Sequence, residues 1–397
     1  MRSSRSPFAV FMSLVVLTTG CKKYSELSNM PKPAYIRVFN MITNNPNILQ
    51  NGEINTFLTF LLDPVMDKSN VPQSSAVEGD FLTSRLLYTT SYPTDAANTV
   101  VGAGYVNYEY PGRAHALTAP PINGFDCSSW AQVPSGKHRI VFVSRPPSSI
   151  PFDSLTVAQR SQVIADTVID FQAGEVYTLE AVLKDLTNYN YGVYVRKEEF
   201  THRTYSTDSL YVGIYKVCAN IPQGIANNGY SPVFSWFEDS LVIAASYYTF
   251  NYLTLQYDFV PGAEHDSVRM SGRFSDRPAY MTFPALPQAA FFDPQGVPAA
   301  YGGYGYNPSY GPSGTLPCIM MTVFPLFNQG PLNLYFWANS VNYSNWFIGN
   351  FETLPNLNLI SAQGGKITVY PTLNIMEIVN DRVYITQVQN GFSKIVQ

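Results

Sequence analysis

Charged side chains are scarce in this chain. Asp, Glu, Lys and Arg make up 13% of its 397 residues, about half the share that is usual in soluble proteins. The net charge is −4 and the Lys and Arg residues are scattered, so the sequence lacks the clustered basic surface by which proteins bind nucleic acid. We therefore expect no nucleic-acid partner.

Recognisable catalytic and metal-binding motifs are also lacking. The four histidines have no Cys, Asp or His partner at metal-ligand spacing, and we expect His138 to be a surface residue of a strand. The chain has neither a Gly-x-Ser-x-Gly motif nor a phosphate-binding glycine loop ahead of a helix. Glu198 and Glu199 would point to opposite faces of a strand and could not flank one glycosidic bond. These observations predict no catalytic residue, no metal and no cofactor.

Cysteine is rare, with four residues in the whole chain. Beyond Cys21 there are Cys127, Cys218 and Cys318, an odd number, so at most one internal disulfide can form among them. The alternative is that they are free thiols packed as small hydrophobic residues. Their spacing matches no zinc site.

Long apolar runs are missing as well, and the first residues form a short leader instead of a membrane span. Arg2 and Arg5 precede an apolar run from Phe8 to Leu17, which is far shorter than the roughly 20 residues that a spanning helix needs. The leader ends in Leu17-Thr-Thr-Gly-Cys21, a sequence typical of a bacterial lipoprotein signal. We expect a signal peptide over 1–20 and a lipid on Cys21; the alternative is an ordinary secretory leader.

Aromatic residues are abundant, at 14% of the chain, and favour strands. A Pro-rich tether over 21–33 is followed by β-branched and aromatic runs that predict strands at Tyr35–Phe39, Ile140–Val143, Val176–Leu183, Tyr191–Val195 and Leu253–Phe259. The best helix candidate is Val157–Ala165, because Thr156 and Gln159 have the spacing of a capping box. One helix among many strands indicates an all-β protein.

Three short segments recur in the same order in the two halves. They are Tyr35–Phe39, Gly136–Ile140 and Glu175–Val182 in the first half, and Tyr211–Tyr215, Gly365–Val369 and Arg382–Val388 in the second. We interpret them as two tandem antiparallel β-sandwich domains of immunoglobulin-like type, at 34–200 and 208–397, the second with a long insertion around 220–364. Convergence of strand chemistry is the alternative.

These segments also carry a family resemblance. The runs Ala34–Asn40, Val133–Ile140 and Phe171–Leu179 resemble the opening, middle and closing strands of domain of unknown function 4397. That family implies β-sandwich lipoproteins and secreted proteins, common in Bacteroidota, without established catalytic residues. Cys21-Lys22-Lys23-Tyr24 likewise resembles the start of many Bacteroidota outer-membrane lipoproteins. The resemblance implies an outer-membrane location, facing either the periplasm or the cell surface.

A further resemblance concerns modification. Bacteroidota O-glycosylation uses Asp, then Ser or Thr, then an apolar residue, and five sites match this pattern: Ser154, Thr167, Ser209, Ser240 and Ser267. The alternative is that these Asp-Ser and Asp-Thr pairs form turns that lead into apolar strands.

Two groups of aromatic residues are candidates for ligand binding. Tyr301, Tyr304, Tyr306 and Tyr310 lie in a Gly- and Pro-rich segment that is typical of a loop, where exposed rings could stack on sugars or contact a protein. The alternative is that this loop folds back and its rings pack on their own domain. Trp337 and Trp346 lie near three asparagines and are a second candidate, or else core and strand-edge residues.

The sequence thus favours a non-catalytic lipoprotein of the cell envelope, anchored in the membrane through Cys21, that binds a glycan or another envelope component. A structural or assembly subunit of fimbrillin-like type is the alternative, with Val383–Val396 as a strand that could be donated to a neighbour. A hydrolase without a recognisable motif is third. The oligomeric state stays open.

Overall fold

The computed structural model describes most of the residues between 30 and 284 and several strands beyond them. The described residues are 30–42, 57–85, 91–93, 116–148, 150–185, 188–206, 209–219, 240–251, 256–259, 266–284, 315–325, 332–337, 358–363, 366–371, 373–379 and 382–388. The chain divides into two compact units, Met1–Pro31 and Lys32–Gln397. All the secondary structure reported below belongs to the second unit.

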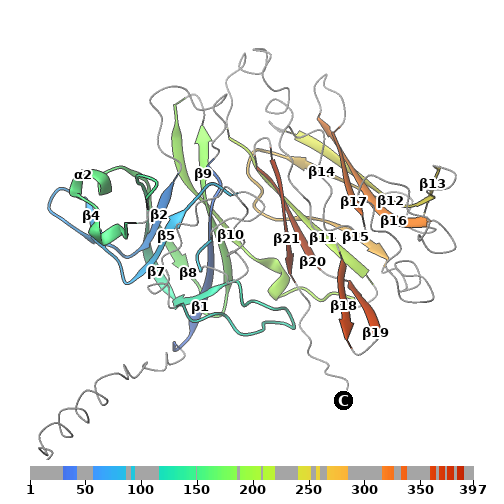
Figure 1. Ribbon diagram of the computed structural model, residues 1–397, viewed down its shortest axis with the longest axis horizontal. Helices are drawn as coiled ribbons and strands as arrows, with labels where there is room; N and C mark the ends of the chain where they lie inside the picture. Colours follow the sequence, from blue (N-terminus) through green and yellow to red (C-terminus); the bar gives the residue numbers. More distant parts are fainter. Residues whose placement is uncertain are drawn as a thin grey trace, which may run out of the picture. The chain divides into compact units, whose positions relative to one another are not determined.

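The protein is mostly β-structure, as the sequence predicts, and four sheets contain most of its strands (Figure 1). Sheet I has the order β10 (Asn190–Lys197), β9 (Val176–Asp185), β1 (Pro33–Asn40), β6 (Ala131–Pro134), and sheet II the order β5 (Val77–Leu82), β2 (Leu58–Leu62), β7 (Gly136–Ser144), β8 (Val163–Phe171). Sheet III has the order β15 (Ala279–Pro284), β11 (Ser209–Val217), β20 (Leu373–Val379), β21 (Arg382–Val388). Sheet IV has the order β13 (Gln256–Phe259), β12 (Ser240–Asn251), β16 (Thr315–Pro325), β17 (Leu332–Trp337), and β14 (Asp266–Ser271) also pairs with β12. Two small hairpins complete the described strands: β3 (Val65–Met66) with β4 (Pro72–Ser74), and β18 (Asn358–Gln363) with β19 (Lys366–Pro371).

Each of the four large sheets shares an apolar core with one other sheet. Sheets I and II share a core that includes Ile36, Phe60, Phe142 and Leu179. Sheets III and IV share another, built from residues such as Val212, Ile243, Met321 and Met376. We call sheets I and II the N-terminal sheet pair, and sheets III and IV the C-terminal sheet pair.

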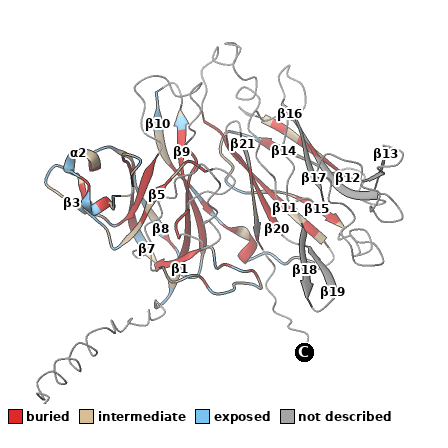
Figure 2. Cartoon of the chain, in the orientation of Figure 1, coloured by how far each residue is buried: buried red, intermediate tan, exposed pale blue. Residues whose placement is uncertain are grey.

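The central strands of sheets I and III are buried along almost their whole length. Figure 2 shows β1, β9 and β20 mainly in the colour of buried residues. Side chains alternate between the two faces of a strand, so each of these strands must be covered on both faces. One face carries the apolar core, and the other faces the site described in the next subsection.

The pairing within sheets I and III differs from the antiparallel pattern that we expect. β1 pairs in parallel with β9, and β11 pairs in parallel with β20, while the other neighbours in both sheets are antiparallel. A parallel pair needs a long crossover connection, and here more than a hundred residues separate the two strands of each pair. This long-range pairing leaves no local signal in the sequence.

The two sheets have matching topology. β1 and β11 occupy equivalent places, each between a parallel and an antiparallel neighbour. The strand equivalent to β9 is β20, however, and not the segment Arg382–Val388, which forms β21 and is equivalent to β10. The Gly136–Ile140 and Gly365–Val369 segments also differ, because the first lies in β7 of sheet II and the second in β19 of a hairpin.

The predicted helix is shorter than expected. α2 spans only Val157–Arg160, and its capping box forms as predicted, because the Gln159 N–H donates to Thr156 Oγ1 while Gln159 Oε1 accepts from the Thr156 N–H. From Val163 onward the chain is strand β8, whose β-branched residues pair with β7. The other helical turns among the described residues are η2 (Phe152–Ser154) and η3 (Glu199–Thr201). No helix among the described residues is long and apolar enough to cross a membrane.

The predicted insertion at 220–364 has a structural role. It supplies β12, β13, β14, β16 and β17, which are all the strands of sheet IV, and also β15 of sheet III. The core between sheets III and IV therefore contains residues of the predicted insertion. Within this segment Phe259 of β13 is 45% exposed, so the predicted apolar face of this strand is not buried at that point.

We predict that Phe142→Ala lowers the free energy of unfolding by about 3–5 kcal/mol, because the ring is fully buried and its removal leaves a cavity. Val168→Ala, at an exposed position of β8, is the matched control and should change stability by less than about 0.5 kcal/mol. Urea unfolding followed by circular dichroism measures both. Equal effects of the two substitutions would contradict the core assignment.

Candidate functional site

Sheets I and III contact each other through the faces that point away from their cores. Two mixed clusters contain side chains from both sheets: Tyr35, Val176 and Phe200 meet Tyr215, Leu373, Ile375 and Val388 in one, and Phe39, Met41, Val182 and Tyr194 meet Val217, Val379 and Tyr384 in the other. We call this contact the junction. It buries polar as well as apolar groups, and the polar groups make it a candidate site.

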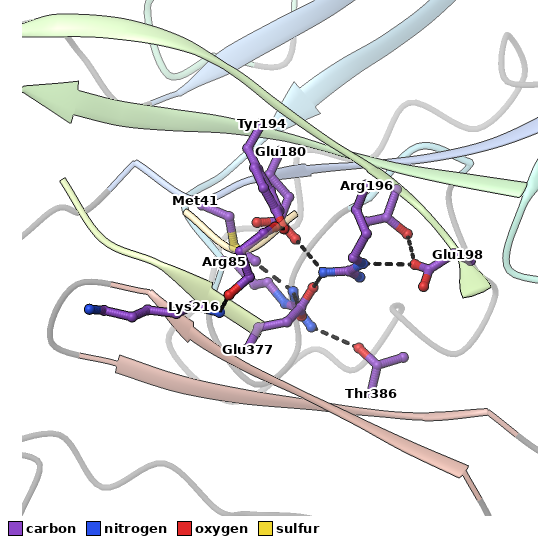
Figure 3. Close-up of polar contacts among 11 residues, drawn as sticks. Met41, Arg85, Glu180, Tyr194, Arg196, Glu198, Lys216, Glu377 and Thr386 are labelled. Carbon is purple, nitrogen blue, oxygen red and sulfur yellow. Dashed lines mark hydrogen bonds and ion pairs between the residues drawn. The ribbon is translucent and has the colours of Figure 1, made fainter. Parts of the chain in front are cut away.

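One carboxylate connects the two sheet pairs across the junction. Glu377 of β20 accepts a hydrogen bond from Arg85 Nη1 at 2.6 Å and another from Arg196 Nη1 at 2.5 Å (Figure 3). Both arginines belong to the N-terminal sheet pair, and all three side chains are 7% exposed or less. Buried ion pairs of this kind are costly to break, because removal of one partner leaves an uncompensated charge.

Two further glutamates surround Arg196. Glu198 Oε1 accepts from Arg196 Nε at 3.0 Å and from the Thr178 hydroxyl at 2.5 Å, and Glu180 Oε1 lies 3.3 Å from Arg196 Nη1. Together with Arg37, which is also buried, they complete a cluster of three arginines and three glutamates. We call Arg37, Arg85, Arg196, Glu180, Glu198 and Glu377 the junction ion cluster.

The environment shifts the pKa values of the neighbouring residues Glu180 and Glu377 in opposite directions. Burial raises the pKa of Glu180 well above its usual value, and the charge of Glu377 raises it further. Burial also acts to raise the pKa of Glu377, but the charges of Arg85 and Arg196 outweigh it and hold this pKa far below the usual range. Glu180 Oε2 is buried and has no hydrogen-bond partner among the described residues.

Two tyrosines mark an internal pseudo-symmetry at the junction. Tyr194 lies opposite Glu180 in sheet I and donates to the Ser275 carbonyl at 2.6 Å, whereas Tyr384 lies opposite Glu377 in sheet III and donates to the Arg85 carbonyl at 2.8 Å. Each tyrosine therefore reaches from its own sheet to a loop that is hydrogen-bonded to the other sheet. The two halves of the junction are therefore built alike.

An open pocket lies at one edge of the junction. It has a volume of about 690 Å³ and is lined by Lys197, Glu198, Glu199, His202, Arg203, Asp276 and Arg277. This volume is in the range typical of small-molecule sites. We call it the junction pocket; its lining carries both signs of charge.

Ion pairs and ring contacts position the lining residues. Glu175 binds Lys197 Nζ at 3.0 Å and His202 Nε2 at 2.7 Å; burial acts to raise the pKa of Glu175, but these two partners lower it more. The Arg203 guanidinium lies 3.9 Å from the centre of the Tyr280 ring. Glu198 belongs both to the pocket and to the ion cluster, so the floor of the pocket is continuous with the buried charges.

Half of the sequence-predicted site residues lie outside the described residues. They include Cys21, Trp346 and the four tyrosines Tyr301, Tyr304, Tyr306 and Tyr310. The backbone of Trp337 is described and pairs opposite Cys318 at the end of β17. The predicted roles of these residues therefore remain predictions.

The five candidate glycosylation sites are all described. Ser154 and Ser267 are exposed, and Thr167, Ser209 and Ser240 are partly exposed. Ser209 and Ser240 are the first residues of β11 and β12, and the Ser267 N–H bonds to the Asp266 carboxylate at 2.8 Å. The structure is therefore compatible with both hypotheses, accessible hydroxyls and turns that lead into strands.

No disulfide joins Cys127 and Cys218, and both side chains are buried. Burial raises the pKa of Cys127 to about 12, which makes it an unreactive packing residue. Our expectation for His138 is wrong: it is 9% exposed, and its Nδ1 lies 2.5 Å from Asp63. No group of three or more potential metal ligands occurs among the residues that the structure describes.

The junction ion cluster is the feature that the sequence analysis missed. Its members come from segments as distant as Arg37 and Glu377, and each is a single charge within an apolar strand. The available signal is the charged residue itself, since an isolated charge in a β-branched run is exceptional when both faces of the strand are buried. Glu180 within Val176–Leu183 is the clearest case.

We predict that Glu377→Gln lowers the free energy of unfolding by about 3–5 kcal/mol, because Arg85 and Arg196 lose the charge that compensates both. Glu180→Gln is the matched control, since burial raises the pKa of this carboxyl and favours its neutral form, which an amide resembles, and it should cost less than about 1.5 kcal/mol. Urea unfolding at pH 7 compares them. A larger loss for Glu180→Gln would show that Glu180 is ionised.

We also predict a pH dependence from Glu180. Its carboxyl titrates near pH ~4.3 in the unfolded chain and at a higher pH in the folded protein, so the folded state binds more protons between these values. The stability of the wild type relative to Glu180→Gln should therefore fall as the pH rises from 5 to 8, by up to about 1.4 kcal/mol per pH unit until the folded carboxyl ionises. Unfolding curves at four pH values test this, and a constant difference would refute it.

Comparison with known proteins adds little to this description. No family model matches the chain, and no curated protein matches it either. Among solved structures the chain shows a distant similarity to "a putative cell adhesion protein" from Parabacteroides distasonis, with 8% sequence identity, a TM-score of 0.17, and coverage of 92% of this chain and 100% of that chain. A TM-score of this size carries no argument about fold or function.

Proposed function

We propose that the protein is a non-catalytic lipoprotein of the cell envelope that binds a glycan or another envelope component. In this proposal the two sheet pairs are tandem β-sandwich domains of the domain of unknown function 4397 type, and lipid on Cys21 holds them at the outer membrane. The leader and Cys21 support the location, and the resemblance of Ala34–Asn40 supports the family.

The single observation that supports ligand binding is the junction pocket. Lys197, Arg203 and Arg277 supply hydrogen-bond donors, Glu199 and Asp276 supply acceptors, and the pocket is open to solvent. A sugar hydroxyl both donates and accepts, so a lining of this mixed kind suits it better than it suits a purely anionic or cationic ligand. Tyr280 beside Arg203 adds a ring of the type that packs on sugars.

The ion cluster supports a rigid platform beneath this pocket. Because Glu377 is bonded to arginines of the other sheet pair, movement of one sheet pair against the other would separate buried opposite charges. A pocket lined from both sides of the junction, by Arg203 and by Arg277, would therefore keep its shape. Pre-organisation of this kind lowers the entropic cost of binding.

An assembly subunit is the second candidate, and one observation favours it. β21 pairs with β20 on one side only among the described strands, and an unpaired strand edge can accept a strand from another chain. Arg382–Val388 is itself β21, however, so this part of the proposed donor strand would first have to leave β20. Residues 389–397 lie outside the described residues.

We predict saturable binding of the full chain to members of a glycan panel, with Cys21→Ser introduced to prevent lipidation. Arg203→Ala with Arg277→Ala should weaken binding at least tenfold, because both side chains line the pocket and are exposed enough to be replaced without unfolding. Arg269→Ala, an exposed arginine of β14 outside the pocket, is the matched control and should bind as the wild type does.

A variant with alanine at Tyr301, Tyr304, Tyr306 and Tyr310 distinguishes the two candidate sites. Binding that this variant loses and the arginine variant keeps would move the site to the tyrosine segment. Absence of binding at millimolar glycan would overturn the glycan proposal. Concentration-dependent oligomers in gel filtration would then favour the assembly subunit.

A further inference from the structure

Arg37 is the one arginine of the junction ion cluster whose charge has no hydrogen-bonded carboxylate among the described residues. It lies on β1, is 3% exposed, and its guanidinium carbon lies 4.0 Å from the centre of the Trp130 ring and 4.8 Å from that of Phe39. Ring faces attract a cation, but they do not satisfy its N–H groups. A buried guanidinium needs acceptors for these donors.

The unsatisfied donors of Arg37 are on one edge of the guanidinium. Nε and Nη2 are both buried without a hydrogen-bond partner, and these two groups form the side-on fork that binds carboxylates and other small anions. The indole N–H of Trp130 is also buried and unsatisfied. Because this nitrogen belongs to the ring on which Arg37 lies, the three donors occupy one buried region.

The charges of the junction ion cluster also indicate that Arg37 lacks a carboxylate partner of its own among the described residues. Glu180, Glu198 and Glu377 all lie within ion-pair distance of Arg85 or Arg196, and burial raises the pKa of Glu180 well above its usual value. Lys216 is buried nearby, but its side chain points away from the cluster in Figure 3. Burial lowers the pKa of Arg37 to about 10, although the charges of Glu198 and Glu377 act to raise it. The guanidinium is thus incompletely compensated.

We propose that the Nε and Nη2 edge of Arg37, together with the Trp130 indole N–H, binds a small monovalent anion inside the junction. The donors on this edge suit an anion, and the ring faces of Trp130 and Phe39 lie beside the guanidinium. The bound anion makes the contact between the two sheet pairs sensitive to halide concentration, and this site is independent of the junction pocket.

The test is the thermal stability of the full chain carrying Cys21→Ser, measured in sodium chloride and in sodium gluconate at equal ionic strength. A ligand that binds only the folded state raises its stability in a saturable way. We expect Tm to be higher in chloride by about 2–4 °C and the difference to level off with concentration. Equal Tm values in the two salts would overturn the proposal.

Variants separate this site from general salt effects. Trp130→Phe keeps the ring and removes one donor, so the chloride response should need a several-fold higher concentration. Arg37→Met keeps an unbranched side chain over the rings and should abolish the response. Arg139→Gln, which alters an exposed ion pair with Asp166, is the matched control and should respond as the wild type does. A chloride response that persists in both Trp130→Phe and Arg37→Met would overturn the proposal.

A direct observation decides the matter even if Arg37→Met does not fold. Crystals of the same full chain grown in bromide should show an anomalous peak about 3.3 Å from Arg37 Nε and Nη2. A well-ordered water at that position, without anomalous signal, would mean that the donors are satisfied by solvent and would refute the anion site.

Discussion

The bonds that Glu377 makes to Arg85 and Arg196 are the interaction on which the rest of the structure depends. A carboxylate that is completely buried must be compensated where it lies, so these bonds determine how β20 is placed against β9 and β10. The outer faces of sheets I and III then become interior, and strands such as β1 and β9 are buried on both faces. The remaining clusters of the junction, apolar and polar, follow from this contact.

The junction is pseudo-symmetric in geometry and asymmetric in charge. Glu180 and Glu377 occupy equivalent positions, opposite Phe39 and Tyr215 in the parallel pairs. Arg37, in contrast, is matched by Gly213 in sheet III, where a Cβ atom would come within 3.1 Å of the Tyr280 ring. The N-terminal side of the junction thus supplies all three arginines of the junction ion cluster, and sheet III supplies Glu377, which is bonded to two of them.

The junction ion cluster and the junction pocket share one residue, Glu198. Glu198 is bonded to Arg196 and Thr178 on one side and lines the junction pocket on the other. A ligand in the pocket would therefore act on the same charges that hold the two sheet pairs together. This continuity places the proposed binding site beside buried ion pairs, which are the kind of support that holds a preformed site.

The sequence by itself determined the β-rich class, the place of β1, β7, β9 and β10, and the capping box of Thr156. These features depend on neighbouring residues, which a linear pattern records. The end of the helix at Arg160, the parallel pairing of β1 with β9 and the use of the 220–364 segment as sheet IV were decided only by the tertiary structure. The same holds for the junction ion cluster. Arg37 and Glu377 are far apart in the sequence and are brought together by the packing of sheet I against sheet III, which the residues next to them in the sequence do not specify.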